Sequence, residues 1–93
     1  MDDGVKVMSA AAKAFEYRKR GMSPEEVLMN ISKMTSSERD QKTKIGMIAS
    51  ATKTLSVIDK NPSYNERQVL SEVMRELPSI IERANEEFDF SRK

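Results

Sequence analysis

The side chains that could act as nucleophiles or proton carriers are few, because the chain contains no histidine and no cysteine. This composition excludes a thiol nucleophile and a thiolate metal ligand, and it removes the commonest proton carrier. Only a serine activated by a lysine would remain for nucleophilic catalysis. Many of the serines gather where helices are expected to begin, at Ser23, Ser36, Ser37 and Ser63. A hydroxyl at such a position caps backbone amides, so these serines indicate capping rather than catalysis.

Two pairs of glutamates have the spacing that acid–base chemistry could use. Glu25 and Glu26 open an expected helix, and Glu72 and Glu76 are one helical turn apart on a polar face. Both pairs fit an ordinary solvated helix surface. The sequence also contains neither a P-loop nor a dinucleotide-binding fingerprint. We therefore predict a protein that is not an enzyme, with no catalytic residue, no cofactor and no metal site.

Basic residues offer a second chemistry, the binding of phosphates. They gather at the end of the first expected helix and in the middle of the chain, at Lys13, Arg18, Lys19, Arg20, Lys33, Arg39, Lys42, Lys44, Lys53 and Lys60. The net charge is only +1, however, and no aromatic residues alternate with the basic ones. A nucleic-acid-associated regulator that uses the basic residues of the first and third helices is therefore the alternative function rather than the leading one.

The segment YRKRGMSPEEVL, residues 17–28, has the outline of a helix-turn-helix, with a helix end, a glycine and a second helix start. In DNA-binding versions of this motif, the N-terminal residues of the second helix meet bases and phosphates. Here those residues are Pro24, Glu25 and Glu26. Two carboxylates at this point would repel phosphate, so the segment indicates a junction between helices and disfavours nucleic acid as a partner.

Apolar residues at helical spacing predict an all-α fold, with one helix over about 3–20 and another that begins at Ser23. The first helix presents Val5, Met8, Ala11, Ala12 and Phe15 on one face. Gly21 can take the left-handed conformation that ends a helix. Ser23 and Glu26 have the spacing of a capping box. The second helix then presents Val27, Leu28, Ile31 and Met34 on one side.

A third helix is expected over about 37–59, after the capping-box spacing of Thr35 to Glu38. One of its faces carries Ile45, Ile48, Ala49, Thr52 and Leu55, and a second stripe carries Met47, Ala51 and Ile58. An apolar arc this wide indicates a helix that packs on more than one side.

A fourth helix is expected after the same spacing at Ser63 to Glu66, and it contains a proline. Its apolar residues are Val69, Leu70, Val73, Met74, Leu77, Ile80, Ile81, Ala84 and Phe88. Pro78 lacks a backbone donor and clashes with the preceding turn of a helix. We expect either a kink there or a break after which Pro78 opens a fifth helix. The prediction is a single domain over 1–93, a compact bundle of four to five short helices with 89–93 frayed.

The sequence carries no signal for a membrane. No apolar run approaches the roughly 18 residues of a membrane span, so no membrane partner is expected. The N-terminal segment MDDGVKV lacks the features of a signal peptide. The chain as given is therefore expected in the cytoplasm, with the periplasm or secretion as the alternative if a signal peptide has been removed.

The methionines and Tyr17 give the positive indication of function. Seven methionines are many for 93 residues, and they either fill a core poor in aromatic residues or form an adaptable binding surface. Met29 and Tyr17 lie off the predicted core stripes. We predict a module that binds another protein or a second copy of itself. The expected surface surrounds the first turn and the second helix, and consists of Tyr17, Arg18, Arg20, Met22 and Met29.

The run AAAKAFEYRKRGMSPEEVLMNI, residues 10–31, resembles a pattern found in small secreted helical proteins of proteobacteria, most of them of unknown function. The matching residues are Tyr17, Arg18, Gly21, Ser23 and Val27, and the later Asn61-Pro62-Ser63 followed by a helix is similar in outline. The resemblance implies a helical fold and no catalytic residue. Members often carry a signal peptide and a pair of cysteines, and this chain has neither.

Overall fold

The computed structural model describes residues 2–80, 82–83 and 86, and the regular structure in these ranges is helical. Four helices follow one another along the chain: α1 (Asp2–Lys19), α2 (Pro24–Thr35), α3 (Gln41–Lys60) and α4 (Glu66–Arg75). A further helical segment begins at Leu77. The predicted all-α bundle of four to five short helices is thereby confirmed.

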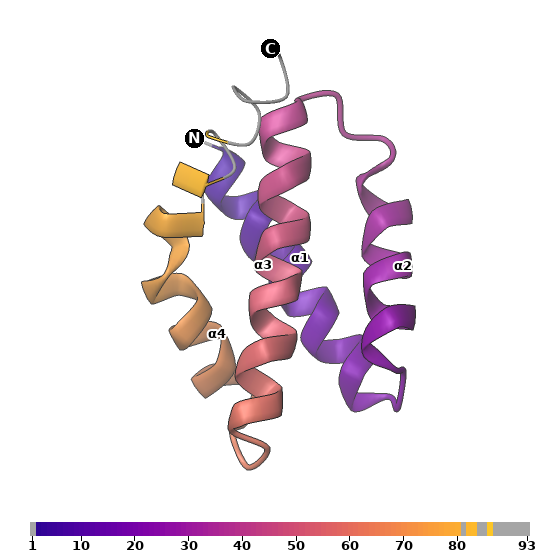
Figure 1. Cartoon of the computed structure of the whole chain (residues 1–93), viewed down its shortest axis with the longest axis vertical. Coiled ribbons are helices and arrows are strands. Elements are labelled where there is room, and N and C mark those ends of the chain that lie inside the picture. The colour runs from indigo at the N-terminus through magenta and orange to yellow at the C-terminus, as the bar shows by residue number, and fades with distance from the viewer. Residues whose placement is uncertain (1, 81, 84–85, 87–93) are drawn as a thin grey trace.

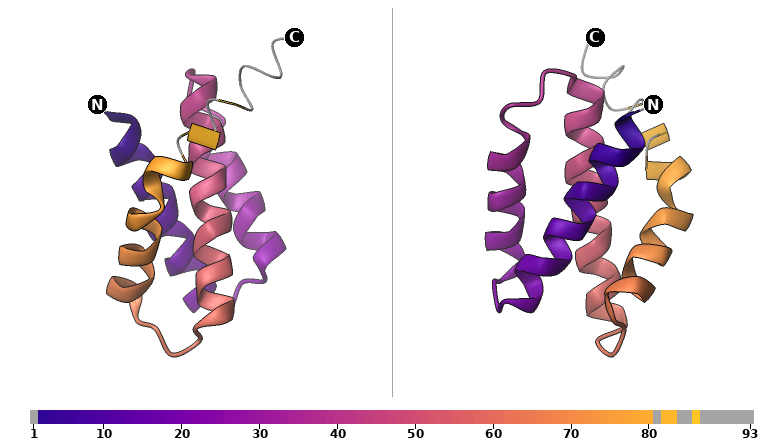
Figure 2. Two further views of the ribbon diagram at one scale, coloured as in Figure 1. Left: turned by 60° about the vertical axis from the view of Figure 1, so that its left-hand side comes forward. Right: turned by 180° about the vertical axis from the view of Figure 1, so that it is seen from behind.

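Helices α1 and α3 form the centre of the bundle. Helix α1 crosses obliquely behind α3 in Figure 1, and α2 and α4 lie on opposite sides of this pair. Both views in Figure 2 keep the same order, with α2 and α4 held apart by the central helices. Each outer helix therefore packs against both central helices, and α3 keeps one face that is turned away from α1.

Small side chains line the crossing of α1 and α3. The buried residues of α1 on this side are Val7, Ala10, Ala11 and Ala14, and those of α3 are Gly46, Met47, Ser50, Ala51 and Thr54. A Cβ atom on Gly46 would lie only 3.0 Å from Val7 Cγ2. The buried Ser50 hydroxyl lies 2.7 Å from the Val7 carbonyl oxygen and 2.9 Å from that of Met47. The small residues thus let the two helices approach closely.

Part of the predicted core is wrong. Ile48 and Thr52, which were expected to face inward, are exposed on α3. Val5 and Met74 were also expected in the core, and their exposed fractions are 69% and 58%. The apolar arc of α3 offered two faces, and the face with smaller side chains packs against the alanines of α1. Helices with small contact residues can lie closer together, which brings more atoms into van der Waals contact.

The helix starts follow the predicted chemistry in one case and differ in two. The capping box of Ser23 and Glu26 is confirmed, with hydrogen bonds of 3.2 and 2.9 Å. Helix α3 begins at Gln41 rather than near 37, because Asp40 is its N-cap and accepts from the Thr43 amide. Helix α4 is capped by Asn65 rather than by Ser63.

The helical structure is interrupted just before Pro78. Glu76 ends α4, and its amide donates to the carbonyl oxygens of Glu72 and Val73. Helical structure resumes at Leu77, so Pro78 lies in a first helical turn, where its missing N–H costs nothing. The break, one of the two predicted outcomes, is therefore confirmed. The predicted apolar positions Ile81, Ala84 and Phe88 and the expected fraying over 89–93 lie outside the described residues.

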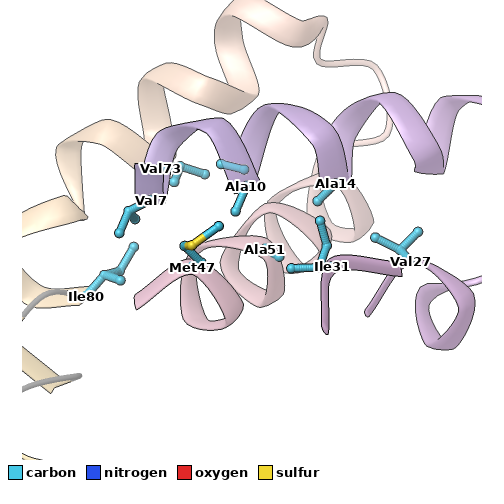
Figure 3. Close-up of a cluster of buried hydrophobic side chains, with 10 residues drawn as sticks. Val7, Ala10, Ala14, Val27, Ile31, Met47, Ala51, Val73 and Ile80 are labelled. Atoms are coloured by element: carbon cyan, nitrogen blue, oxygen red, sulfur yellow. The ribbon is translucent and has the colours of Figure 1, made fainter. Parts of the chain in front are cut away.

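The core consists of two neighbouring clusters. In the larger one, Ile80 of the C-terminal segment reaches Val7 of α1 and Met47 of α3, and Val27 and Ile31 of α2 fill the other end (Figure 3). The smaller cluster joins α1, α3 and α4 through Phe15, Val57 and Val69. Ile80 thus anchors the C-terminal segment to the central pair.

Candidate functional site

The structure brings four of the predicted surface residues, Tyr17, Arg18, Arg20 and Met22, together at the turn between α1 and α2. Gly21 ends α1 with a φ of 100°, as predicted. The Arg18 guanidinium donates to the Met22 carbonyl oxygen at 3.1 Å, and the Met22 amide donates to the Tyr17 carbonyl oxygen at 3.3 Å. Arg20 lies in the same turn and pairs with Glu16 at 2.6 Å. These contacts hold the turn in shape.

The apolar members of the predicted surface differ in exposure. Tyr17 and Met22 are half-buried and pack against the larger core cluster. Lys13 Nζ lies 5.9 Å from the centre of the Tyr17 ring. Met29, further along α2, is 59% exposed. Of this predicted set, Met29 is therefore the apolar side chain most available to a partner.

A groove lies elsewhere, along the face of α3 turned away from α1. Its volume is about 520 Å³, and it is lined by Ile45, Ile48, Ala49, Thr52, Lys53, Ser56, Ile80 and Arg83. The first six residues belong to α3, Ile80 belongs to the helical segment over 77–80, and Arg83 belongs to the helical residues 82–83. Sequence reasoning missed this site, because the same isoleucines were expected to form the core. The competing stripe of small residues on α3 was the signal that could have found it.

The two walls of the groove are set by different parts of the fold. Ile45, Ile48, Ala49 and Thr52 recur at the spacing of one helix face, so a single rigid helix presents them together. The other wall depends on Ile80, which is only 7% exposed and packs in the core. Arg83 lines the groove together with Ile80.

The lining of the groove is apolar with a positive edge. Lys53 and Arg83 are its charged residues, and neither forms an ion pair with any residue that the structure describes. Helix α3 carries four lysines against one aspartate, Asp59. The groove therefore combines an apolar floor with a local excess of positive charge.

The carboxylates with shifted pKa values lie outside the groove, in the turn between α2 and α3. A hydrogen bond from Lys6, at 2.8 Å, lowers the pKa of Glu38, and the Asp40 amide adds a second. The Thr43 hydroxyl and amide lower the pKa of Asp40. Both carboxylates are thus held ionised in structural roles. Within the ranges described above, no group of three or more potential metal-ligating side chains occurs.

Comparison with known proteins finds no match to this chain among protein-family models, curated proteins or solved structures. The helices of the described part of the chain are too short or too polar to cross a membrane. Two surfaces of the molecule are therefore candidates for its function, the α3 groove and the exposed side of α2 around Met29.

Proposed function

We propose that this chain is a non-enzymatic module that binds another protein. The observation that supports the proposal is the apolar face of α3, where Ile45, Ile48 and Ala49 line an open groove while smaller residues fill the core. Burying apolar surface against a partner gains roughly 25 cal/mol per Å². An apolar patch that a small protein leaves in water is a feature of interaction sites.

The predicted surface around Met29 is the second candidate for the same function. Its support is the 59% exposure of a flexible thioether side chain on α2. The two surfaces lie on different elements, so one experiment can separate them. A photo-crosslinking amino acid is placed at position 48, at position 29, or at the exposed Arg67 of α4 as the matched control.

The proposal predicts a crosslink to a polypeptide in cells from position 48 and none from position 67. The crosslinked protein is then purified, and its affinity is measured with wild type and with Ile48→Asp. Crosslinks from position 29 alone would move the binding surface to α2. The absence of any polypeptide crosslink from both positions 48 and 29 would overturn the proposal.

Self-association is a special form of this function and is tested directly. Sedimentation velocity over a wide concentration range separates a monomer from a dimer. A dimer that Ile48→Asp dissociates would identify the partner as a second copy of the chain.

The alternative, nucleic-acid binding, is less well supported by the basic residues of α1. Arg20 and Lys13 pair with Glu16, and Arg18 donates to the turn, so much of this positive charge is engaged within the molecule. The decisive measurement is a titration of duplex DNA and of RNA at two salt concentrations. Binding that weakens steeply with salt would favour the nucleic-acid function over the one proposed here.

A further inference from the structure

The groove on α3 has the form of a seat for a helix. It extends over residues 45–56 of α3, a length of about 16 Å or three helical turns, and Ile80 and Arg83 line its other side. In Figure 1, α1 passes behind α3, and among the described helices none crosses the near side of α3. Ile48 and Thr52 are exposed at the open side. An open apolar groove of this length suits the i, i+3/i+4 and i+7 anchors of an amphipathic helix.

The shape also argues against a small apolar ligand as the main occupant. Small-molecule sites bury most of the ligand surface inside a concave pocket. Here the side chain at position 48 stands at the edge of the groove with an exposed fraction of 36%. A ligand lying on this face would keep one side in water, whereas a helix of a partner protein would bring its own protein surface to cover it.

The charges of the lining indicate the chemistry of the partner. Lys53 and Arg83 contribute positive charge, and among the residues that the structure describes the lining contains no acidic side chain. A second copy docked face to face would bring the same cations together, because a two-fold interface uses one patch twice. Opposed like charges disfavour such a pairing. Carboxylates beside the apolar face of a different helix would instead pair with both cations.

We propose that the groove binds an amphipathic helix of the partner protein, with its apolar side against Ile45, Ile48 and Ala49 and its carboxylates on Lys53 and Arg83. This inference rests on the proposed protein-binding function and names the kind of segment that the module recognises. Helices with basic residues at the corresponding positions are disfavoured by the same charges.

The probe is a displayed library of amphipathic helical peptides of about 20 residues, which is long enough to form helix in part before binding. The library carries Leu or Ile at the helical anchor positions and mixed Glu, Gln and Lys beside them. Peptides that bind the whole wild-type chain are kept, and peptides that also bind the Ile48→Asp variant are discarded. Selection should enrich glutamate beside the apolar face, and Ile48→Asp should weaken the selected peptides at least about thirtyfold.

Charge reversal tests the role of the cations. Lys53→Glu and Arg83→Glu should each weaken the selected peptides about fivefold. The double variant should prefer peptides in which lysine replaces the selected glutamates. Lys60→Glu on the same helix makes the same charge change outside the lining of the groove and should have little effect. Circular dichroism of each variant confirms that the fold is retained.

Three results would overturn the inference: no enrichment of helical peptides, enrichment of basic peptides, or selected peptides that ignore the reversal of Lys53 and Arg83. A dimer dissociated by Ile48→Asp, or a small amphiphile that native mass spectrometry finds bound to wild type and not to Ile48→Asp, would replace the partner helix with another occupant. The proposed function fails separately, when positions 48 and 29 both give no polypeptide crosslink. If a protein crosslinks but the charge reversals leave its affinity unchanged, the function stands and this inference fails.

Discussion

At Gly46, α3 passes so close to α1 that a single added carbon has no free space. A Cβ atom there would lie 3.0 Å from Val7 Cγ2. Gly46→Ala gains about 1 kcal/mol in helix propensity, but the crowded contact costs about 1–3 kcal/mol. We expect the substitution to bring no net gain in the free energy of unfolding in the wild-type chain.

The crowding is isolated by repeating Gly46→Ala in a Val7→Ala background, where the clashing methyl group is gone. The substitution should then be more favourable than in wild type by about 1 kcal/mol or more. Urea denaturation of the four proteins measures this coupling. Equal effects of Gly46→Ala in both backgrounds would show that the added Cβ atom does not clash with Val7.

Glu38 gives the stability of the bundle a dependence on acid pH. Hydrogen bonds from Lys6 and from the Asp40 amide hold its pKa below the ordinary value in the folded state. A lowered pKa contributes stability that is present above the unfolded value and is lost as the pH falls through the folded one. For a glutamate this loss begins below about pH 5, near the ordinary pKa, and continues as the pH falls through the lowered pKa of the folded state.

Glu38→Gln should therefore flatten the fall in the free energy of unfolding over that range and lower stability slightly at neutral pH. The measurement is urea denaturation at a series of pH values. Glu82→Gln is the control, because Glu82 is exposed and pairs with no residue in the described part of the chain. If Glu38→Gln and wild type lose stability in parallel, the ion pair with Lys6 does not couple folding to pH.

At the scale of helices, the start of α4 gives a test between two caps that lie two residues apart. The Asn65 side chain accepts from the Gln68 amide at 2.9 Å, and the Gln68 side chain accepts from the Asn65 amide at 2.9 Å. Asn65→Ala should lower the free energy of unfolding by about 1 kcal/mol. Ser63→Ala removes the cap that the sequence favours and should change it by less than about 0.5 kcal/mol. A larger loss in the free energy of unfolding for Ser63→Ala than for Asn65→Ala would show that α4 is capped at Ser63.

The positions of the caps show what the sequence could decide at this scale. Ser23 and Glu26 were identified correctly because Pro24 and Gly21 support the same helix start. The spacing at 35–38 had no such support, and the Glu38 side chain pairs with Lys6, more than thirty residues away. A pairing between distant residues leaves no local signal in the sequence, so the start of α3 could not be found from spacing alone.

The orientation of α3 was beyond sequence reasoning for a related reason. Both faces of the helix carry apolar residues, and hydrophobicity alone favours the face with Ile45 and Ile48. Which face of α3 is buried depends on the opposite helix, α1. Its small residues Ala10, Ala11 and Ala14 allow the two helices to pack closely when the facing residues of α3 are small as well. The groove therefore could not be predicted from α3 alone, whereas the position of Met29 off the core face of α2 could be predicted from the spacing in its own helix, and Met29 is 59% exposed.

At the scale of the whole molecule, the groove joins a strongly packed element to a weakly packed one. Helix α3 lies at the centre and contacts each of the other three helices. The segment that begins at Leu77 reaches the core through Ile80. Regions with fewer buried contacts open more readily than the centre of a domain. The wall that carries Arg83 is therefore expected to open more often than the wall formed by α3.

Hydrogen exchange tests this difference in the free protein. Amides near Ala10, Ala14, Ala51 and Thr54, at the crossing of α1 and α3, should exchange most slowly, through global unfolding. Amides over 77–80 should exchange faster, through local opening. Uniform protection across these regions would mean that the bundle opens as one unit and that the segment over 77–80 is held as firmly as the crossing of α1 and α3.

Binding at the groove should change this pattern in a way that identifies the surface. A partner that bridges α3 and the C-terminal segment stabilises the closed form, so protection should rise most over 77–80, where the free protein opens most readily. With Ile48→Asp the same partner concentration should leave the exchange over 77–80 close to that of the free protein. A rise confined to residues 21–35 would instead place the partner on the surface around Met29, and the apolar face of α3 would then need another explanation.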